Sequence, residues 1–265
     1  MTSDKTASGL LEQARRDIDE IDDELVALLA QRFAVTARVR SAKAGEAQPW
    51  PLPLRPAREA QILRRVVKAG REVALSPQLL VRLWRGILVQ SSLNQSPITL
   101  HVSHHLKSNP ALRVKLHDAF GDMPIEDYRD EAQALMQINA DPSGLCVVET
   151  ERPWAEAFMD GRAGAARVIA GLPVIAGAEA QASLLVLGQA PMGETGEDET
   201  LVISTGRLPR DFPLMPLWQA KSGALRLTAL PGFIGEHESP LIGLTRSNPA
   251  LGLRIAGHYS RPIGL

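Results

Sequence analysis

The chain has 265 residues, enough for two domains of ordinary size, and its 45% content of hydrophobic residues supports a buried core. A formal net charge of −1 excludes the strongly basic surface that is typical of proteins bound to nucleic acid or anionic membranes. A single cysteine excludes an internal disulfide framework and a cluster of thiolate metal ligands. The polar first nine residues and the lack of a long apolar run predict a soluble, cytoplasmic protein without a membrane partner.

A repeating apolar stripe predicts one long helix over residues 10–44. Apolar residues recur three or four positions apart between Leu11 and Leu28, as they do on the buried face of a helix. Ser8 is the expected N-cap, and Gly45 with the nearby proline ends the helix. A stripe of this length needs more apolar surface than two short neighbouring helices offer, so we expect a dimer.

Arg32 stands on this stripe where the pattern calls for an apolar residue. A guanidinium group in a core must find an anion, because its desolvation is costly. Lys43 follows eleven residues later and projects near the same face, about 16 Å along the axis. Two cations on the buried side of one helix predict a pocket for a small anionic ligand.

Two further helices follow a proline-rich connector. The segment 48–56 carries four prolines and is expected to be extended. Pro56 suits the first position of a helix that runs to about residue 69, before Gly70. The Ser76-Pro77 pair predicts the start of a third helix, which ends near residue 96.

The pattern changes at Pro97, after which short β-rich runs alternate with helical segments. This alternation predicts an α/β domain. The expected strands lie at 98–103, within the run MPIEDY, at 144–150, and in the apolar runs 166–175, 183–188 and 200–204. We therefore divide the chain at residues 96–98, into an all-α domain of residues 1–96 and an α/β domain of residues 97–265.

Residues 1–96 resemble the all-helical chorismate mutases, which are intertwined dimers of three-helix subunits. The matching strings are ARRDIDEIDDELVALLAQR, SAKAG, RPAREAQIL and VRLWRGILVQSSLNQ, in the order and spacing of the family apart from a short insertion in the connector. The resemblance implies that chorismate, a dicarboxylate, rearranges to prephenate in one pericyclic step that needs no cofactor and no metal. Catalysis then comes from holding a compact conformer and from stabilising the negative charge that builds on the ether oxygen.

The resemblance also implies a role for each site residue. Arg32 would bind one substrate carboxylate, and the partner subunit's Arg15 would bind the other. Lys43 and Gln95 would donate to the ether oxygen, and Glu59 would bind the substrate hydroxyl. The position of Arg15 agrees with this, because 17 residues of helix turn it about 100° away from the face of Arg32.

Two further residues match the family, and one departs from it. Arg58 matches a position that supports the backbone, and Ser91 matches a polar residue near a substrate carboxylate. Ser91 and Gln95 are four positions apart, so they are adjacent on one face of a helix. Arg55, however, stands where many members carry an aspartate near the substrate hydroxyl, which leaves Glu59 to recognise that group alone.

Each of these residues also has a purely structural interpretation. Arg15 could belong to a solvated helix face, and Arg32 could be paired with Glu24 or Glu59. Ser91 and Gln95 are common residues in helices. Their joint spacing with Lys43 and Glu59 favours a site.

Residues 97–265 resemble the prephenate dehydratases more weakly, in the strings EAQALMQINADPSGLCVVETE, ASLLVLG and ETLVIST. The glycine-rich opening of that family is replaced by HVSHHLKSN, and its catalytic Thr-Arg-Phe by Ala182, Ser183 and Leu184. We therefore expect no dehydratase activity. HESP (237–240), YSRP (259–262) and SGAL (222–225) loosely resemble the phenylalanine-binding motifs of the family's regulatory module.

The remaining polar features point to structure rather than to a second site. His101, His104 and His105 are expected to be histidines at the surface or at a strand end, without a metal, and Cys146 a small buried hydrophobe. The basic run 64–71 has no interleaved aromatic residue, so we expect a solvated helix face and no nucleic-acid partner. Chorismate mutase is the leading hypothesis. The alternatives are a non-catalytic regulatory or binding protein of the aromatic pathway and a bifunctional mutase–dehydratase.

Overall fold

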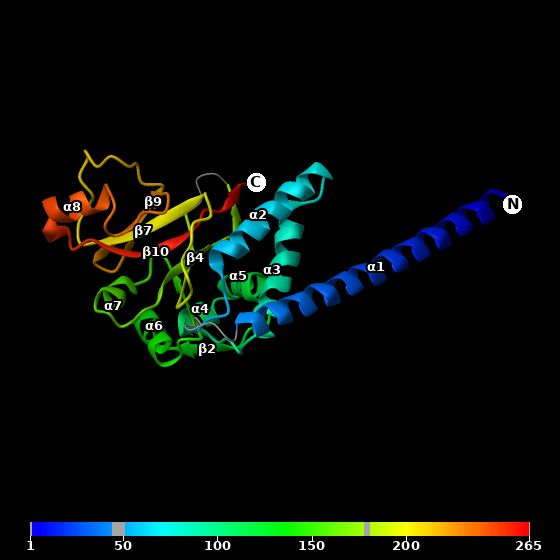
Figure 1. The fold of residues 1–265 in the computed structure, drawn as a ribbon, viewed down its shortest axis with the longest axis horizontal. Helices are drawn as coiled ribbons and strands as arrows, with labels where there is room; N and C mark the ends of the chain where they lie inside the picture. Colours follow the sequence, from blue (N-terminus) through cyan, green and yellow to red (C-terminus); the bar gives the residue numbers. More distant parts are fainter. Residues whose placement is uncertain (1, 44–50, 178–180, 265) are drawn as a thin grey trace. The chain divides into compact units, whose positions relative to one another are not determined.

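The computed structural model of the chain describes residues 2–43, 51–177 and 181–264; the side chains of residues 2–7, 39, 40, 42 and 43 lie outside that description. By its internal contacts the chain divides into two compact units, residues 1–49 and 50–265 (Figure 1). The first unit is built on one helix, and the second holds two further helices and an α/β layer. The predicted boundary at residues 96–98 stays a prediction. It assigns the second and third helices to the first domain, whereas the division by internal contacts assigns them to the second unit.

The long N-terminal helix is present as α1 (Thr2–Lys43), of 42 residues. It begins before the predicted start, so the expectation that Ser8 caps it was wrong. No proline precedes Ser8, and nothing in that stretch stops a helix from continuing. The predicted apolar stripe is also exposed in the single chain, with relative exposures of 53–58% at its central positions, Leu11, Ile18, Ile21, Leu25 and Leu28.

Helices α2 (Pro56–Glu72) and α3 (Pro77–Leu93) pack against each other and form the α2–α3 hairpin. As predicted, Ser76 caps α3, and its side chain accepts a hydrogen bond from the amide of Leu79. The predicted end of α2 before Gly70 was wrong. Gly70 lies inside the helix, where a Cβ atom would stand 2.0 Å from Cδ1 of Leu80, so this glycine allows the two helices to approach closely.

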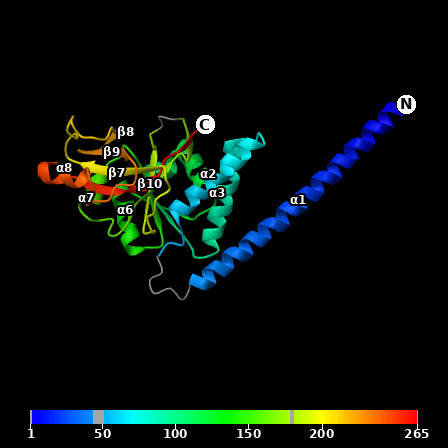
Figure 2. The same cartoon turned by 45° about the horizontal axis from the view of Figure 1, so that its top comes forward.

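The α/β body contains one nine-stranded mixed sheet, in the order β2-β1-β3-β6-β4-β10-β7-β9-β8, and Figure 2 shows the last four strands one above another. Strands β1–β2, β1–β3 and β4–β10 are parallel pairs, and the other neighbours are antiparallel. The strands are β1 (Leu100–Ser103), β2 (Ile125–Tyr128), β3 (Leu145–Glu149), β4 (Arg167–Leu172), β6 (Leu184–Gly188), β7 (Asp198–Ser204), β8 (Trp218–Ser222), β9 (Leu225–Pro231) and β10 (Arg254–Ser260). A separate small sheet pairs β5 (Ile175–Ala176) with β11 (Ile263–Gly264).

Both faces of the sheet are covered, and the alternation of side chains along β3 shows it. Leu145 and Val147 point into a core with α5, whereas Cys146 and Val148 point into a core with α6 and α7. Cys146 is fully buried, as predicted, and burial raises the pKa of its thiol. The helices of the body are α4 (His104–Ser108), α5 (Pro110–Phe120), α6 (Glu131–Ala140), α7 (Ala155–Met159) and α8 (Leu241–Ser247), followed by a 3-10 turn (Pro249–Leu251). In the described part of the chain, no helix is both long and apolar enough to cross a membrane.

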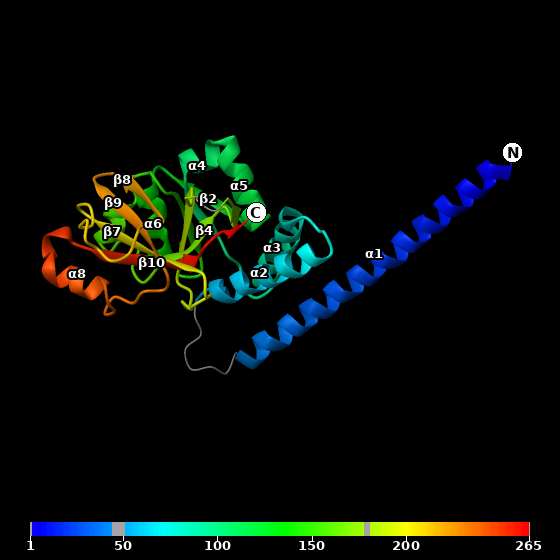
Figure 3. The same cartoon turned by 90° about the horizontal axis from the view of Figure 1, so that it is seen from above.

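The α2–α3 hairpin shares its core with the body. Val89 of α3 and Leu52, which precedes α2, belong to the same buried cluster as Leu100 and Phe120. Ile263 of β11 packs with the apolar residues between α2 and α3. Helix α3 also lies beside α5 (Figures 1 and 3). The hairpin is therefore part of the second compact unit, although its sequence belongs to the region that we assigned to the first domain.

Gly257 is a position in β10 at which we expect a large loss of stability on substitution. A Cβ atom there would stand 2.1 Å from the carbonyl oxygen of Val168 in β4, and that backbone cannot move without breaking the sheet. We expect Gly257→Ala to lower the free energy of unfolding by about 3 kcal/mol, at the upper end for overpacking. Chemical denaturation measures the change. Gly243→Ala in α8 is the control, because its Cβ meets nothing within 4 Å; equal effects of the two changes would contradict the prediction.

Candidate active site

Three of the predicted site residues lie on α1. Arg15 is exposed and Arg32 is half-buried. Lys43 is the last residue of the helix, and its side chain lies outside the described residues. Because α1 is continuous, the 17 positions from Arg15 to Arg32 turn the two side chains about 100° apart and separate them by about 25 Å along the axis. One copy of the helix therefore does not aim both guanidinium groups at one small ligand.

The structure brings Ser91 and Gln95 together at the C-terminal end of α3. The predicted end of this helix near residue 96 was wrong, because α3 ends at Leu93 and Gln95 follows in a turn. Ser91 is buried, and its Oγ donates to the carbonyl of Ile87 at 2.7 Å. Gln95 lies beyond the last residue of the helix, yet its Nε2 donates to the carbonyl of Ser91 at 2.9 Å. Arg58, in the first turn of α2, is exposed.

Glu59 of α2 forms an ion pair with Arg85 of α3, which the sequence analysis did not anticipate. Oε2 of Glu59 lies 3.7 Å from Nη1 of Arg85, and the two side chains are 18% and 13% exposed. Burial raises the pKa of the Glu59 carboxyl, while the charge of Arg85 and a backbone hydrogen bond at Arg55 oppose this rise. Burial also lowers the pKa of Arg85, and Glu59 opposes that change. Each group thus favours the charged form of the other.

Arg85 is itself held by the α/β body. Its Nε and Nη2 atoms both donate to the carbonyl of Ala119 in α5, at 3.1 and 2.6 Å. Its guanidinium carbon lies 5.7 Å from the centre of the Phe120 ring, within the range of a cation–π contact. Like Arg32, Arg85 is a cation on a partly apolar helix face, and this was the sequence signal that could have pointed to it. Its pairing with Glu59 could not be predicted, because the two residues are 26 positions apart in the sequence.

A cavity lies between the α2–α3 hairpin and the sheet, and both Glu59 and Arg85 line it. Of the predicted site residues whose side chains the structure describes, Glu59 is the one that belongs to its lining. The apolar wall includes Leu63, Val89, Phe120, Met123, Leu145 and Val186, and the polar side includes Thr195, Asp198, His258, Tyr259 and Arg261. An apolar pocket with a few polar groups is the usual form of a small-molecule site.

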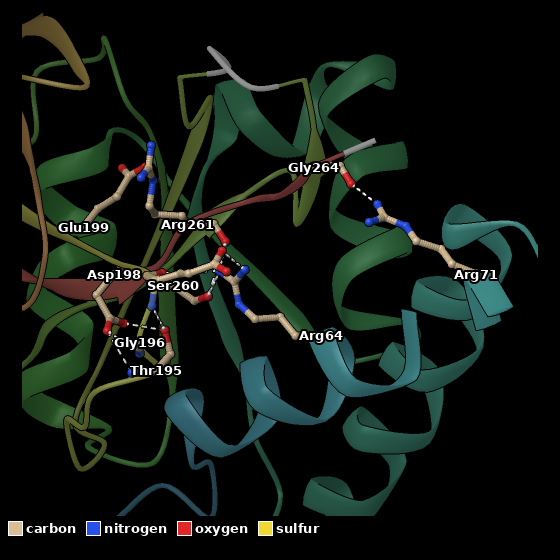
Figure 4. A network of polar contacts seen from close by, with 10 residues as sticks. Arg64, Arg71, Thr195, Gly196, Asp198, Glu199, Ser260, Arg261 and Gly264 are labelled. Carbon is tan, nitrogen blue, oxygen red and sulfur yellow. Dashed lines mark hydrogen bonds and ion pairs between the residues drawn. The ribbon is translucent and has the colours of Figure 1, made fainter. Parts of the chain in front are cut away.

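Two arginines of α2 bind the C-terminal segment of the chain, from the end of β10 to β11. Arg64 donates to Oγ of Ser260 at 2.8 Å and to the carbonyl of Arg261 at 2.7 Å (Figure 4). It also pairs with Glu197. Arg71 donates to the carbonyl of Gly264. The prediction that the run 64–71 is a solvated face was therefore wrong for Arg64, whose side chain is 19% exposed.

Arg55, the residue that departs from the family pattern, is the N-cap of α2. Its Nη1 donates to the carbonyl of Leu54 at 2.9 Å and approaches that of Leu52 at 3.4 Å. The guanidinium group thus binds the backbone of its own segment. Its backbone carbonyl accepts the amide of Glu59 at 2.9 Å, which fixes the first turn of α2.

The positions predicted to replace the dehydratase triplet, Ala182, Ser183 and Leu184, lie at the start of β6. Ala182 is buried, and its carbonyl accepts a hydrogen bond from the hydroxyl of Thr150. Ser183 receives a hydrogen bond from Nζ of Lys115 at 3.1 Å. Leu184 begins β6 and is fully buried.

The expectation of surface or strand-end histidines was wrong for His101. This residue is 4% exposed in β1, and its ring nitrogens lie 3.1 Å from the hydroxyl of Tyr128 and 3.1 Å from Oδ2 of Asp141. His104 and His105 lie on α4 rather than on the strand, where Nε2 of His105 is 3.2 Å from Oε1 of Glu149. Among the residues that the structure describes, no group of three or more His, Cys, Asp or Glu side chains could hold a metal ion.

The model of the family described as chorismate mutase type II matches residues 14–96. This confirms the resemblance predicted for the N-terminal part of the chain. The matched range contains all the predicted site residues, namely Arg15, Arg32, Lys43, Arg58, Glu59, Ser91 and Gln95.

No curated protein matches the sequence. Two solved structures are similar at low sequence identity. The first is described as GqqA, a novel type of quorum quenching acylase; the similarity has 8% identity and a TM-score of 0.39, and covers 63% of this chain and 96% of that one. The second is prephenate dehydratase from Streptococcus mutans, with 14% identity and a TM-score of 0.36, over 62% of this chain and 97% of that one. Scores this low do not establish a shared fold.

Proposed function

We propose that the protein is a chorismate mutase that acts as a homodimer and converts chorismate to prephenate without a cofactor. The observation that carries the proposal is the match of residues 14–96 to the chorismate mutase type II family. The reaction needs cations and hydrogen-bond donors around a dicarboxylate, and the predicted residues supply these groups.

In this proposal Arg32 binds one carboxylate of chorismate and the partner subunit's Arg15 binds the other. Lys43 and Gln95 donate to the ether oxygen, where negative charge develops in the transition state. Ser91, which contacts Gln95, lies near a substrate carboxylate, and Glu59 binds the hydroxyl with Arg58 beside it.

The proposed dimer is supported by apolar surface that the single chain leaves exposed. The stripe of α1 is one such surface, and Leu79 and Leu83 of α3, 50% and 51% exposed, are another. Exposed apolar faces of this kind are typical of protein–protein interfaces. The angular separation of Arg15 from Arg32 supports a site that takes Arg15 from the second copy.

We further propose that the α/β body is not a dehydratase. Loss of water and carbon dioxide from prephenate needs an acid near the leaving hydroxyl, and Ala182 cannot donate a proton. Its place in the packing of the sheet supports a structural role.

A non-catalytic regulatory protein is the second candidate, and one observation favours it. Arg55 stands where many members of the family carry an aspartate near the substrate hydroxyl. In this alternative the helices bind an aromatic-pathway metabolite without turning it over.

The experiment that separates the two adds purified full-length protein to chorismate and follows its absorbance, with prephenate measured at the end. We expect chorismate to disappear well above the uncatalysed rate and prephenate to accumulate. No loss above the uncatalysed rate at micromolar protein would contradict the mutase and favour the regulatory protein. Consumption of added prephenate would contradict the absence of dehydratase activity.

A further inference from the structure

Among the contacts between the α/β body and the α2–α3 hairpin is one made by a buried cation, Arg85. Arg85 lies on α3, but the Ala119 carbonyl that accepts its two hydrogen bonds is in α5. The Phe120 ring beside it fixes the plane of the guanidinium group further. With two of its nitrogens committed to one carbonyl, Arg85 has little freedom to turn.

The remaining nitrogen, Nη1, is the one that approaches Glu59. An arginine that is held in this way presents its charge at a fixed place and fixes the side chain opposite it. Glu59 is also the residue whose burial opposes ionisation, so the nearby cation favours the carboxylate over the neutral acid. A carboxylate accepts a hydrogen bond from a hydroxyl more strongly than a neutral acid does.

We propose that Arg85 is a positioning residue for the mutase reaction, because it holds the Glu59 carboxylate ionised and oriented toward the substrate hydroxyl. The inference rests on the proposed function. It adds that the α/β body takes part in substrate recognition, through the carbonyl of Ala119 that anchors Arg85.

Other charged or titratable groups line the same cavity as Glu59, and each could also influence the pKa of its carboxyl. Asp198 is committed to the amides of Thr195 and Gly196, and the phenol of Tyr259 donates to Glu199. The charged or titratable side chains that line the cavity with Glu59 are Arg85, Asp198, His258, Tyr259 and Arg261. Arg85 is the member of this set that is paired with Glu59.

The test compares wild type with Arg85→Gln, Arg85→Lys and a matched control, Arg82→Gln. Arg82 lies on the same helix and also pairs with α5, through Asp118 at 3.4 Å, but its side chain is 69% exposed. The kcat and KM for chorismate are measured across pH for each protein. Titration of the Glu59 carboxyl is followed by carbon-13 NMR with carboxyl-labelled glutamate, and the signal is assigned by its loss in Glu59→Gln.

In Arg85→Gln we expect the Glu59 pKa to rise, because burial is no longer offset by a cation. The acidic limb of kcat/KM should then move to higher pH, with about a tenfold loss at the acidic end of the profile that shrinks as the pH rises. KM should carry most of the loss, because the hydroxyl is bound in both the ground state and the transition state. Arg85→Lys should restore most of the acidic limb, and Arg82→Gln should match wild type.

If wild type is active, the inference would be overturned by an Arg85→Gln variant whose acidic limb of kcat/KM and Glu59 carboxyl titration are unchanged. An equal loss of activity at every pH would also overturn it, because only folding would then be affected. An inactive wild type would overturn the proposed function and this inference together. The activity of the wild type therefore shows whether the proposed function fails or only the proposed role of Arg85.

Discussion

Replacing Gln95 with alanine is expected to lower kcat for chorismate by about 100-fold to 1,000-fold, the size of effect seen when one donor to a developing oxyanion is lost. The side chain would donate to the ether oxygen, whose charge grows only as the bond breaks. KM should therefore change little, because the interaction is made in the transition state rather than in the ground state. The decay of chorismate absorbance at saturating substrate measures the change.

Gln90 supplies the matched control for this experiment. It is an exposed glutamine of α3, and its Nε2 donates to Oδ1 of Asn94 at 2.8 Å. Gln90→Ala should keep normal turnover and helix content. Near-normal turnover in Gln95→Ala would show that the proposed assignment of the ether-oxygen donor is wrong.

Truncation to residues 1–96 is expected to abolish cooperative folding of the α2–α3 hairpin, and activity with it. The cut removes the apolar partners of Val89 and exposes side chains whose burial contributes about 1.5–3 kcal/mol each. It also removes the acceptors of Arg64, Arg71 and Arg85 in the body. The free energy of unfolding of a domain is only about 5–15 kcal/mol, so we expect the loss of these contacts to unfold the hairpin.

Circular dichroism during thermal unfolding and the chorismate assay together test the truncation. Mixing residues 1–96 with a separate chain of residues 97–265 is the control, and we expect it to recover helix content and activity in part. A fragment of residues 1–96 that melts cooperatively with wild-type kinetics would contradict this prediction. That result would show that the α2–α3 hairpin folds with α1 as one domain, as the predicted boundary at residues 96–98 states.

Much of the fold was predictable because local signals agreed with the final structure. Pro56 and the Ser76-Pro77 pair begin their helices where expected, since a proline at the first helical position loses no hydrogen bond. Strands such as β3 and β6 are apolar on both faces, which marks them as central strands of a covered sheet.

Strands β8, β9 and β10 escaped prediction; β8 is an edge strand with β9 beside it, whereas β10 lies between β4 and β7. The burial of β8 alternates, and its sequence WQAKS has few of the apolar residues that mark a central strand. The string SGAL, considered as part of a phenylalanine-binding motif, forms the turn between β8 and β9. Long-range pairing defines these elements, and no short window of sequence contains it.

The candidate site was predictable where its residues are close in sequence, as the contact between Ser91 and Gln95 shows. The pairing of Glu59 with Arg85 was not, because it depends on how α2 and α3 pack and on the carbonyl of Ala119 in a third helix. The roles of Arg15, Arg32 and Lys43 remain predictions. They depend on a second copy of the chain.

The most direct test of a shared mutase site mixes two inactive variants, Arg15→Ala and Gln95→Ala, under conditions that let dimers exchange. If Arg15 serves the partner's site, each mixed dimer has one intact site and one doubly defective site. Random exchange makes about half of the dimers mixed, so we expect about a quarter of the wild-type activity, well above either variant alone. No recovery, with an active wild type and mixed dimers confirmed by mass, would contradict a site built from two chains.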